Sequence, residues 1–103
     1  MEKLERLKEY VETEWQKRVH SFQGPHNYTK LITDSDSINH VIEIGCSVLM
    51  TKWPEIGGYP GGSFVQAVVD NDLMSAFSRA DNINIVVMKF YVELLYNFSP
   101  DRI

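Results

Sequence analysis

Four charged side chains near apolar segments, Asp70, Asp72, Arg79 and Asp81, form the densest charged group that could do chemistry. Two carboxylates close together can exchange protons with a substrate, as in general acid–base catalysis. Aspartates more often cap helices and pair with nearby cations. Arg79 follows Asp72 by seven residues, so on one continuous helix the two would share a face. We therefore expect an internal Arg–Asp network that fixes how short helices meet, with a ligand or partner site as the alternative.

A glycine-rich stretch over residues 57–63 leads into a predicted helix. Free N–H groups and the helix dipole at such a start can bind an anion. The phosphate-binding loop needs a lysine directly before its serine or threonine, and here Gly62 precedes Ser63. The plainer interpretation is a loop that ends in a capping box formed by Ser63 and Gln66. If a ligand or partner binds here, the predicted binding residues are Gly61, Gly62, Ser63, Asn71, Asp72, Arg79 and Asp81.

The histidines and the cysteine point to no metal site, no cofactor and no catalytic centre. His20, His26 and His40 are scattered, without a metal-ligand neighbour at helical spacing. Cys46 is alone and lies among apolar residues, which favours a buried small side chain over a reactive thiol. Ser63 lacks the G-x-S-x-G context of a nucleophilic serine. We expect a protein that is not an enzyme.

Length and composition predict one domain over residues 1–103 in the cytoplasm. Apolar residues make up 44% of the 103 positions and charged residues 23%, as in globular proteins. The formal net charge of −4 argues against binding to nucleic acid or to an anionic membrane. No apolar run reaches the ~20 residues of a membrane span, and the amino-terminal stretch lacks the apolar core of a signal peptide.

The hydrophobic pattern predicts an all-α fold, a compact bundle of about four to five helices. Residues 2–22 carry one apolar stripe at spacings of three and four, which is typical of an amphipathic helix. Residues 37–53 also predict a helix, although Gly45 and several β-branched residues leave a buried strand as the competitor. Shorter helices are expected over residues 64–69 and 73–80, and a last helix over residues 82–98. Residues 1–53 resemble no family that we can identify.

The predicted last helix is apolar around most of its circumference. Its only polar stripe contains Asn82, Lys89, Glu93 and Asn97. A helix of this kind must be covered on most sides. The C-terminal helix should therefore be largely buried, either as the central helix or partly in an oligomer, and we expect a homodimer.

Residues 60–100 resemble a small uncharacterised family found in bacteriophages, prophages and other mobile elements. The shared pattern runs through a Gly-Ser-Phe-Val start, then Ala-Val, Asn-Asp-Leu, Arg-Ala-Asp and a final Tyr-Asn followed by proline. The matching positions are Gly62, Ser63, Phe64, Val65, Ala67, Val68, Asn71, Asp72, Leu73, Ala76, Arg79, Ala80, Asp81, Asn84, Tyr96, Asn97 and Pro100. Relatives commonly continue into a further helix, whereas this chain stops at Ile103. The resemblance implies an origin and assigns no chemistry.

These observations favour a non-enzymatic phage or prophage accessory protein. It would bind a protein partner through apolar anchors, and one such role is to inhibit a host defence or regulatory factor. One alternative is a small-molecule or nucleotide sensing or sequestering module, with its pocket where the glycine-rich loop meets Asn71, Arg79 and Asp81. Another alternative is a structural homo-oligomer.

Overall fold

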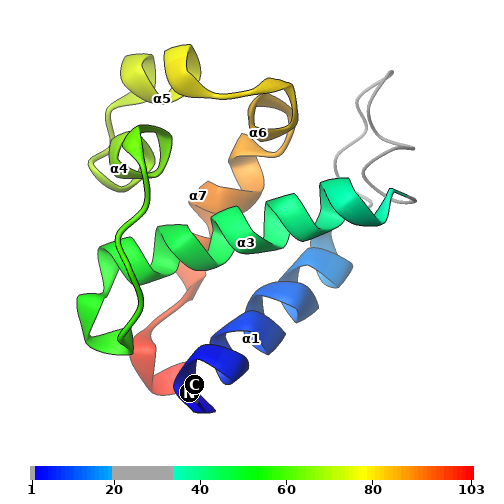
Figure 1. Cartoon of the computed structure of the whole chain (residues 1–103), viewed down its shortest axis with the longest axis vertical. Helices are drawn as coiled ribbons and strands as arrows, with labels where there is room; N and C mark the ends of the chain where they lie inside the picture. Colours follow the sequence, from blue (N-terminus) through cyan, green and yellow to red (C-terminus); the bar gives the residue numbers. More distant parts are fainter. Residues whose placement is uncertain (1, 20–33) are drawn as a thin grey trace.

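The computed structural model of the chain describes residues 2–19 and 34–103, and every regular element within them is helical (Figure 1). The predicted all-α fold is confirmed. The end of the first predicted helix, residues 20–22, lies outside the described residues, as do His20 and His26. The elements in chain order are α1 (Glu2–Arg18), α3 (Ser35–Lys52), the 3-10 helix η2 (Pro54–Ile56), α4 (Ser63–Val69), α5 (Leu73–Arg79), α6 (Asn82–Val86), α7 (Met88–Asn97) and the 3-10 helix η3 (Pro100–Arg102).

Helix α3 crosses the middle of the molecule and contacts α1, α4, α6 and α7 (Figure 1). Asp34 caps its N-terminus. The carboxylate accepts hydrogen bonds from the backbone N–H of Asp36 and from the hydroxyl of Ser37. Both α1 and α7 pack closely against α3 at Gly45. A Cβ atom there would lie 2.9 Å from a methyl of Val11 and 3.0 Å from a methyl of Leu94. The glycine that weakens the sequence prediction of this helix is thus the residue that lets α1 and α7 pack tightly on it.

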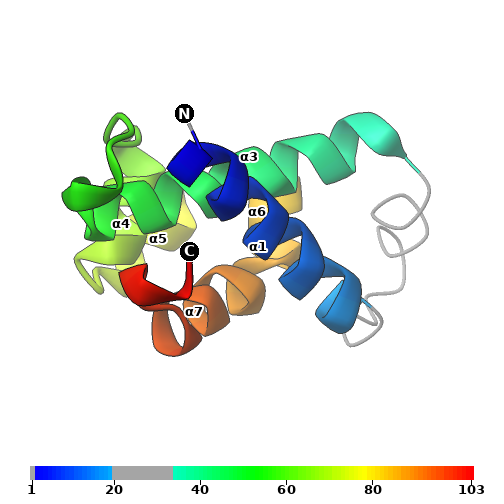
Figure 2. The same cartoon turned by 90° about the horizontal axis from the view of Figure 1, so that it is seen from below.

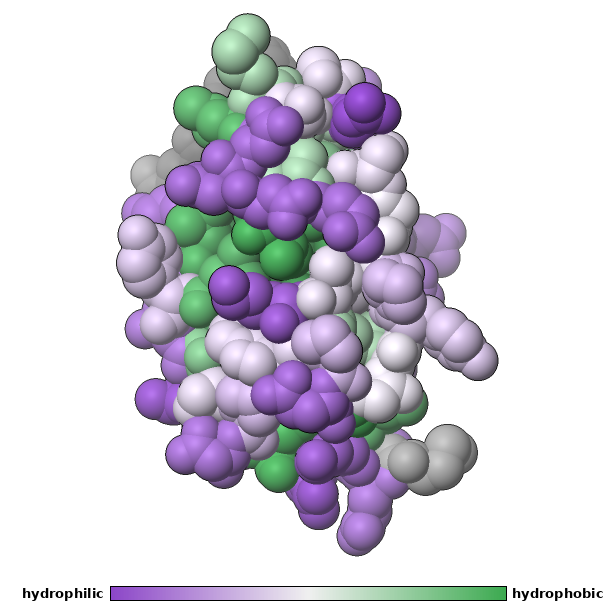
Figure 3. Space-filling model, turned by 90° about the vertical axis from the view of Figure 1, so that its left-hand side faces the viewer, coloured by the Kyte–Doolittle hydropathy of each residue, from purple (hydrophilic) through white to green (hydrophobic). Residues whose placement is uncertain are grey.

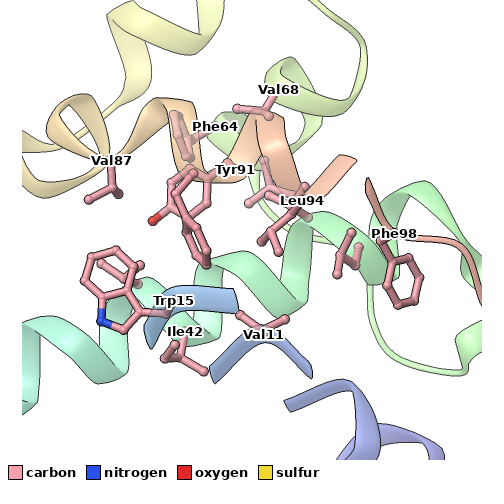
Figure 4. Packing of buried hydrophobic residues seen from close by; sticks show 14 of the residues in the cluster. Val11, Trp15, Ile42, Phe64, Val68, Val87, Tyr91, Leu94 and Phe98 are labelled. Atoms are coloured by element: carbon pink, nitrogen blue, oxygen red, sulfur yellow. The ribbon is translucent and has the colours of Figure 1, made fainter. Parts of the chain in front are cut away.

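Helix α1 buries the apolar stripe expected from its sequence, including Leu7, Val11 and Trp15. Helices α1, α3 and α7 contact one another, and Figure 2 shows how the three are arranged. The ring of Trp15 packs edge-on against that of Phe90 in α7, with centroids 5.2 Å apart. Figure 4 shows Trp15 and Val11 among the buried side chains of this core. Helices α1 and α7 therefore stabilise each other.

Helices α4 and α5 form a tight pair because the chain reverses at Asn71. This residue adopts a left-handed backbone conformation with φ of 60°, which asparagine tolerates better than most residues. The N–H of Asp72 donates to the carbonyl of Ala67 at 2.8 Å, and the N–H of Asn71 donates to that of Val68 at 3.2 Å. This pair of bonds is a Schellman motif. Asp72 then caps α5 by accepting from the N–H of Ser75.

The predicted capping box at the start of α4 is wrong. The cap residue is Gly62, and Ser63 is already the first helical residue, so no side chain caps this helix. The side-chain amide of Gln66 instead donates to the carbonyl of Gly61 at 3.3 Å.

The predicted single helix over residues 82–98 is divided in two at Val87, which is why the described chain has six α-helices rather than four to five. Val87 has φ of −102° and ψ of 16°, outside the helical range, and it ends a run of β-branched residues that weaken a helix. The inward face of α7 is buried as expected. Phe90, Tyr91 and Leu94 pack in the core, and Phe64 of α4 packs on Tyr91 (Figure 4).

Candidate protein-interaction surface

A shallow apolar groove runs between α4, the start of α5 and the outward side of α7. Two adjoining hollows form it, and Val68, Asn71 and Val92 line both. Figure 3 views the side of the molecule that carries α4 and α5, and shows apolar atoms gathered in a hollow between polar side chains. We call this feature the α4–α7 groove. Its lining residues are Lys52, Ala67, Val68, Val69, Asn71, Asp72, Leu73, Ala76, Met88, Val92, Leu95 and Tyr96.

The groove exists because α7 is apolar on two faces and only one is covered. With Phe90, Tyr91 and Leu94 directed into the core, Val92 and Tyr96 fall on the opposite side of the helix. Val92 is 39% exposed and Tyr96 is 85% exposed. A contiguous exposed apolar patch bordered by polar residues is typical of a surface that contacts another molecule.

The edges of the groove are polar and of both charges. Lys52, at the end of α3, lines the hollow that contains Tyr96. Asp72 lines the other hollow, and its carboxylate is already engaged by the N–H of Ser75. The hollow that contains Tyr96 has a volume of about 280 Å³, at the lower limit of the roughly 300–1,000 Å³ usual for small-molecule sites. The groove therefore suits apolar side chains of a protein partner, held by shape and by its polar edges.

The structure does not gather the seven predicted binding residues into one pocket. Gly61, Gly62 and Ser63 lie at the start of α4, whereas Asn71 and Asp72 follow its end. A seven-residue helix separates the two groups by about 10 Å. Asp81 lies beyond the far end of α5. Only Asn71 and Asp72 of the predicted set line the α4–α7 groove, so a ligand site that uses the glycine-rich loop stays a prediction.

Gly61 packs closely against α3, and its backbone N–H is bonded to a side chain there, so this N–H is not free to bind an anion. Its backbone N–H donates to the hydroxyl of Thr51 at 2.8 Å, which holds the loop against α3. A Cβ atom at Gly61 would lie 2.5 Å from the hydroxyl of Ser47 and 2.5 Å from the Cβ of Val65. The loop therefore needs glycine here for its close approach to α3 and α4.

The predicted internal Arg–Asp network is also wrong. Asp72 and Asp81 instead act as helix caps, and Asp81 accepts from the N–H of Asn84 at 2.7 Å. The second oxygen of Asp81 lies 3.0 Å from Nε2 of His40, so this pair joins α3 to the start of α6. Arg79 is exposed and forms no ion pair with any carboxylate of the described residues. His40 is partly exposed, and its ring is engaged by this contact with Asp81.

Cys46 lies half-buried in an apolar hollow between α1 and α3, which is separate from the α4–α7 groove. Leu4, Leu7 and Met50 also line this hollow. Burial raises the pKa of its thiol to about 11, which lowers its reactivity as a nucleophile. No three His, Cys, Asp or Glu side chains of residues 2–19 and 34–103 are grouped so that they could hold a metal ion. In the same residues no helix has the length and apolar character needed to cross a membrane.

Apart from Asn71 and Asp72, the side chains that line the groove were not identified from the sequence. Val68, Met88 and Val92 belong to predicted apolar helices, and Lys52 and Tyr96 stand beside them in the fold. One feature of the sequence pointed toward an exposed apolar surface. The predicted last helix has more apolar residues than one buried face requires.

Comparisons of the chain with protein-family models, with curated proteins and with solved structures find no match. The resemblance of residues 60–100 to a phage and prophage family stays a prediction.

Proposed function

We propose that this chain is a non-enzymatic accessory protein of a bacteriophage or prophage that acts by binding a protein. The α4–α7 groove is the observation that carries this proposal, because it exposes Val92 and Tyr96 beside apolar side chains of α4. The resemblance of residues 60–100 motivates the assignment to a mobile element. Occupying the surface of a host defence or regulatory factor is the mode of action that we favour.

The groove fixes the chemistry of the partner. Apolar side chains of the partner would enter the two hollows over Val68 and Val92, since burying exposed apolar area stabilises a complex by about 25 cal/mol per Å² before the costs of association. The hollow beside Tyr96 and the ammonium group of Lys52 at its edge would fix the orientation of the bound segment. Exposed aromatic side chains are frequent energetic anchors at such interfaces.

The test is affinity capture with paired variants. Purified chain is immobilised, host proteins are passed over it, and bound proteins are identified by mass spectrometry. Val92→Lys and Tyr96→Ala alter exposed groove residues, so both variants should fold. Tyr59→Ala is the matched control, because Tyr59 is 88% exposed but does not line the groove.

We expect one or a few proteins to be enriched by the wild-type chain and by Tyr59→Ala, and to be lost with Val92→Lys. The affinity of the purified pair should fall at least about tenfold in Val92→Lys, in line with an interface anchor. Absence of any enriched protein, or equal capture by the groove variants, would refute the proposal.

A further inference from the structure

The two hollows of the α4–α7 groove repeat along α7 with the period of a helix. Met88, Val92 and Tyr96 follow one another at steps of four residues on the side of α7 that borders the groove. Met88 lines one hollow, Tyr96 lines the other, and Val92 lies between them and lines both. The hollows therefore lie one helical turn apart, roughly 6 Å along α7. Side chains four residues apart on a second helix have the same spacing and fit between those of such a row.

The walls of the groove offer side chains rather than free backbone groups. Every regular element of residues 2–19 and 34–103 is helical, and the lining residues come from α3, α4, α5, α7 and the turn after α4. At that turn the N–H groups of Asn71 and Asp72 already donate to carbonyls of α4. An extended segment would find few backbone partners here, whereas a helix satisfies its own backbone hydrogen bonds. The groove therefore favours a helix as its occupant.

Two lysines give the α7 side of the groove a positive edge. Lys52 lines the hollow that contains Tyr96. Lys89 precedes Val92 by three residues, so it lies on the same exposed side of α7. Both lysines are exposed, and neither forms an ion pair within the part of the chain that the structure describes. Asp72, on the opposite wall, is engaged as the cap of α5. A segment with acidic side chains on the flank that faces α7 is therefore complementary to this groove.

We infer that the partner fills the α4–α7 groove with an amphipathic α-helix that is acidic on one flank. Two apolar side chains four residues apart enter the two hollows. An acidic side chain one turn beyond the anchor that contacts Tyr96 pairs with Lys52. This inference rests on the proposed function and deepens it, because it specifies the secondary structure, the spacing and the charge of the segment that binds.

The first test selects peptides on the full chain and needs no natural partner. One phage-displayed library presents alanine-based helical peptides with randomised surface positions, and a second library presents unstructured peptides. Both are selected on the wild-type chain and depleted on Val92→Lys, so that the retained peptides require the groove. We expect the helical library to give the tighter binders, with two apolar residues four apart and an acidic residue one turn away. Tyr59→Ala should bind these peptides as tightly as wild type, because Tyr59 does not line the groove.

The second test changes the best peptide and measures its affinity by fluorescence polarisation. A proline between the two apolar anchors should weaken binding about a hundredfold if the peptide binds as a helix. Replacing the acidic residue with lysine should weaken binding to the wild-type chain about threefold. Lys52→Glu should recover that loss, and Lys3→Glu, a change at an exposed lysine of α1, should not.

Several results would overturn the inference. These are a lack of any peptide that requires the groove, tighter groove-dependent binders from the unstructured library, and a proline variant that binds unchanged. Failure of Lys52→Glu to recover binding of the lysine peptide would also overturn it. A dimer in sedimentation velocity that Val92→Lys dissociates would place a second copy of the chain in the groove instead.

Failure of this inference is distinguishable from failure of the proposed function. A host protein that is captured by wild type and lost with Val92→Lys, alongside peptides that fail these tests, would support the function and overturn the helical segment. Helical peptides that pass the tests while host proteins are never captured would support the helical segment and refute the function.

Discussion

The hydroxyl of Tyr91 donates a 2.6 Å hydrogen bond to the side-chain carbonyl of Asn84, and both residues are buried. This bond spans the break between α6 and α7 and so fixes the angle at Val87. Burial raises the pKa of Tyr91 above its ordinary value, so the phenol stays protonated and remains a donor. The bond holds in place the helix whose outward side forms the groove.

Replacing Tyr91 with phenylalanine should lower the free energy of unfolding by about 1–3 kcal/mol, because the carbonyl of Asn84 would be left buried without a partner. Urea denaturation at neutral pH measures this. Tyr96→Phe removes the same hydroxyl from an exposed side chain and should change stability by less than about 0.5 kcal/mol. If both variants lose the same free energy of unfolding, the buried hydrogen bond contributes nothing to stability.

Arg18 joins α1 to α7 through a half-buried ion-pair network. Its guanidinium lies 2.9 Å from a carboxylate oxygen of Glu93 and 3.0 Å from one of Glu14. Arg18→Ala should destabilise the fold by about 1–3 kcal/mol. It removes the cation that Glu14 and Glu93 share and leaves both partly buried carboxylates without it. Lys17→Ala is the control, because Lys17 contacts Glu14 from an exposed position and should cost under about 0.5 kcal/mol. Thermal unfolding of both variants provides the comparison.

The same network makes stability depend on acid pH. Burial opposes ionisation of Glu14, but hydrogen bonds from Arg18 and Lys17 outweigh it and hold the pKa of Glu14 below its ordinary value of 4.5. Because the folded-state pKa is the lower one, the stabilisation is complete above about pH 4.5 and is lost as the pH falls through the folded-state value. Glu14→Gln should therefore be less stable than wild type at pH 7, with the difference shrinking on acidification. A difference that stays constant from pH 7 to pH 3 would contradict this account.

Gly45→Val should destabilise the fold by about 1–3 kcal/mol, because the added side chain would overlap Val11 and Leu94. Asn39→Val, in the same helix at an exposed position, controls for the helix propensity of valine, which is close to that of asparagine. Chemical denaturation of both variants should show a lower free energy of unfolding only for Gly45→Val. If Asn39→Val lowers the free energy of unfolding by as much, helix propensity rather than packing explains the effect.

Cys46 should react slowly in the folded protein. Raising its pKa from 9.0 to about 11 lowers the thiolate fraction near pH 8 about a hundredfold. Alkylation by iodoacetamide, followed by mass spectrometry, should therefore be slow in buffer and fast in denaturant. Rapid labelling of the folded chain would mean that the thiol is far less buried than the structure shows.

The helices of this fold were largely predictable, and their junctions were not. The stripe of Leu7, Val11 and Trp15 predicts α1 directly, because a helical period depends only on local sequence. The break at Val87 escaped prediction, since the apolar pattern runs through it without interruption. The Schellman turn at Asn71 was expected only as a boundary.

The site was harder to predict because it depends on contacts between distant residues. Asp72 and Arg79 share a face only on a continuous helix, and the side chain of Asp72 is instead the cap that starts α5. The α4–α7 groove joins Val68 to Val92 through the tertiary fold, which no local spacing reveals. Only the surplus of apolar residues on the last helix pointed toward an exposed apolar surface.

Helix α1 packs against α7, although the two lie at opposite ends of the described chain. During synthesis, 70 positions separate Arg18 from Met88, which at 5–20 residues per second is a delay of roughly 4 to 14 seconds. By the end of that interval α3 has been translated and can cover part of the apolar face of α1, but the part that packs on α7 still has no partner. A chain cut short before α7 would leave Trp15 without the ring of Phe90, and this exposed apolar surface would make it a substrate for chaperones and proteases.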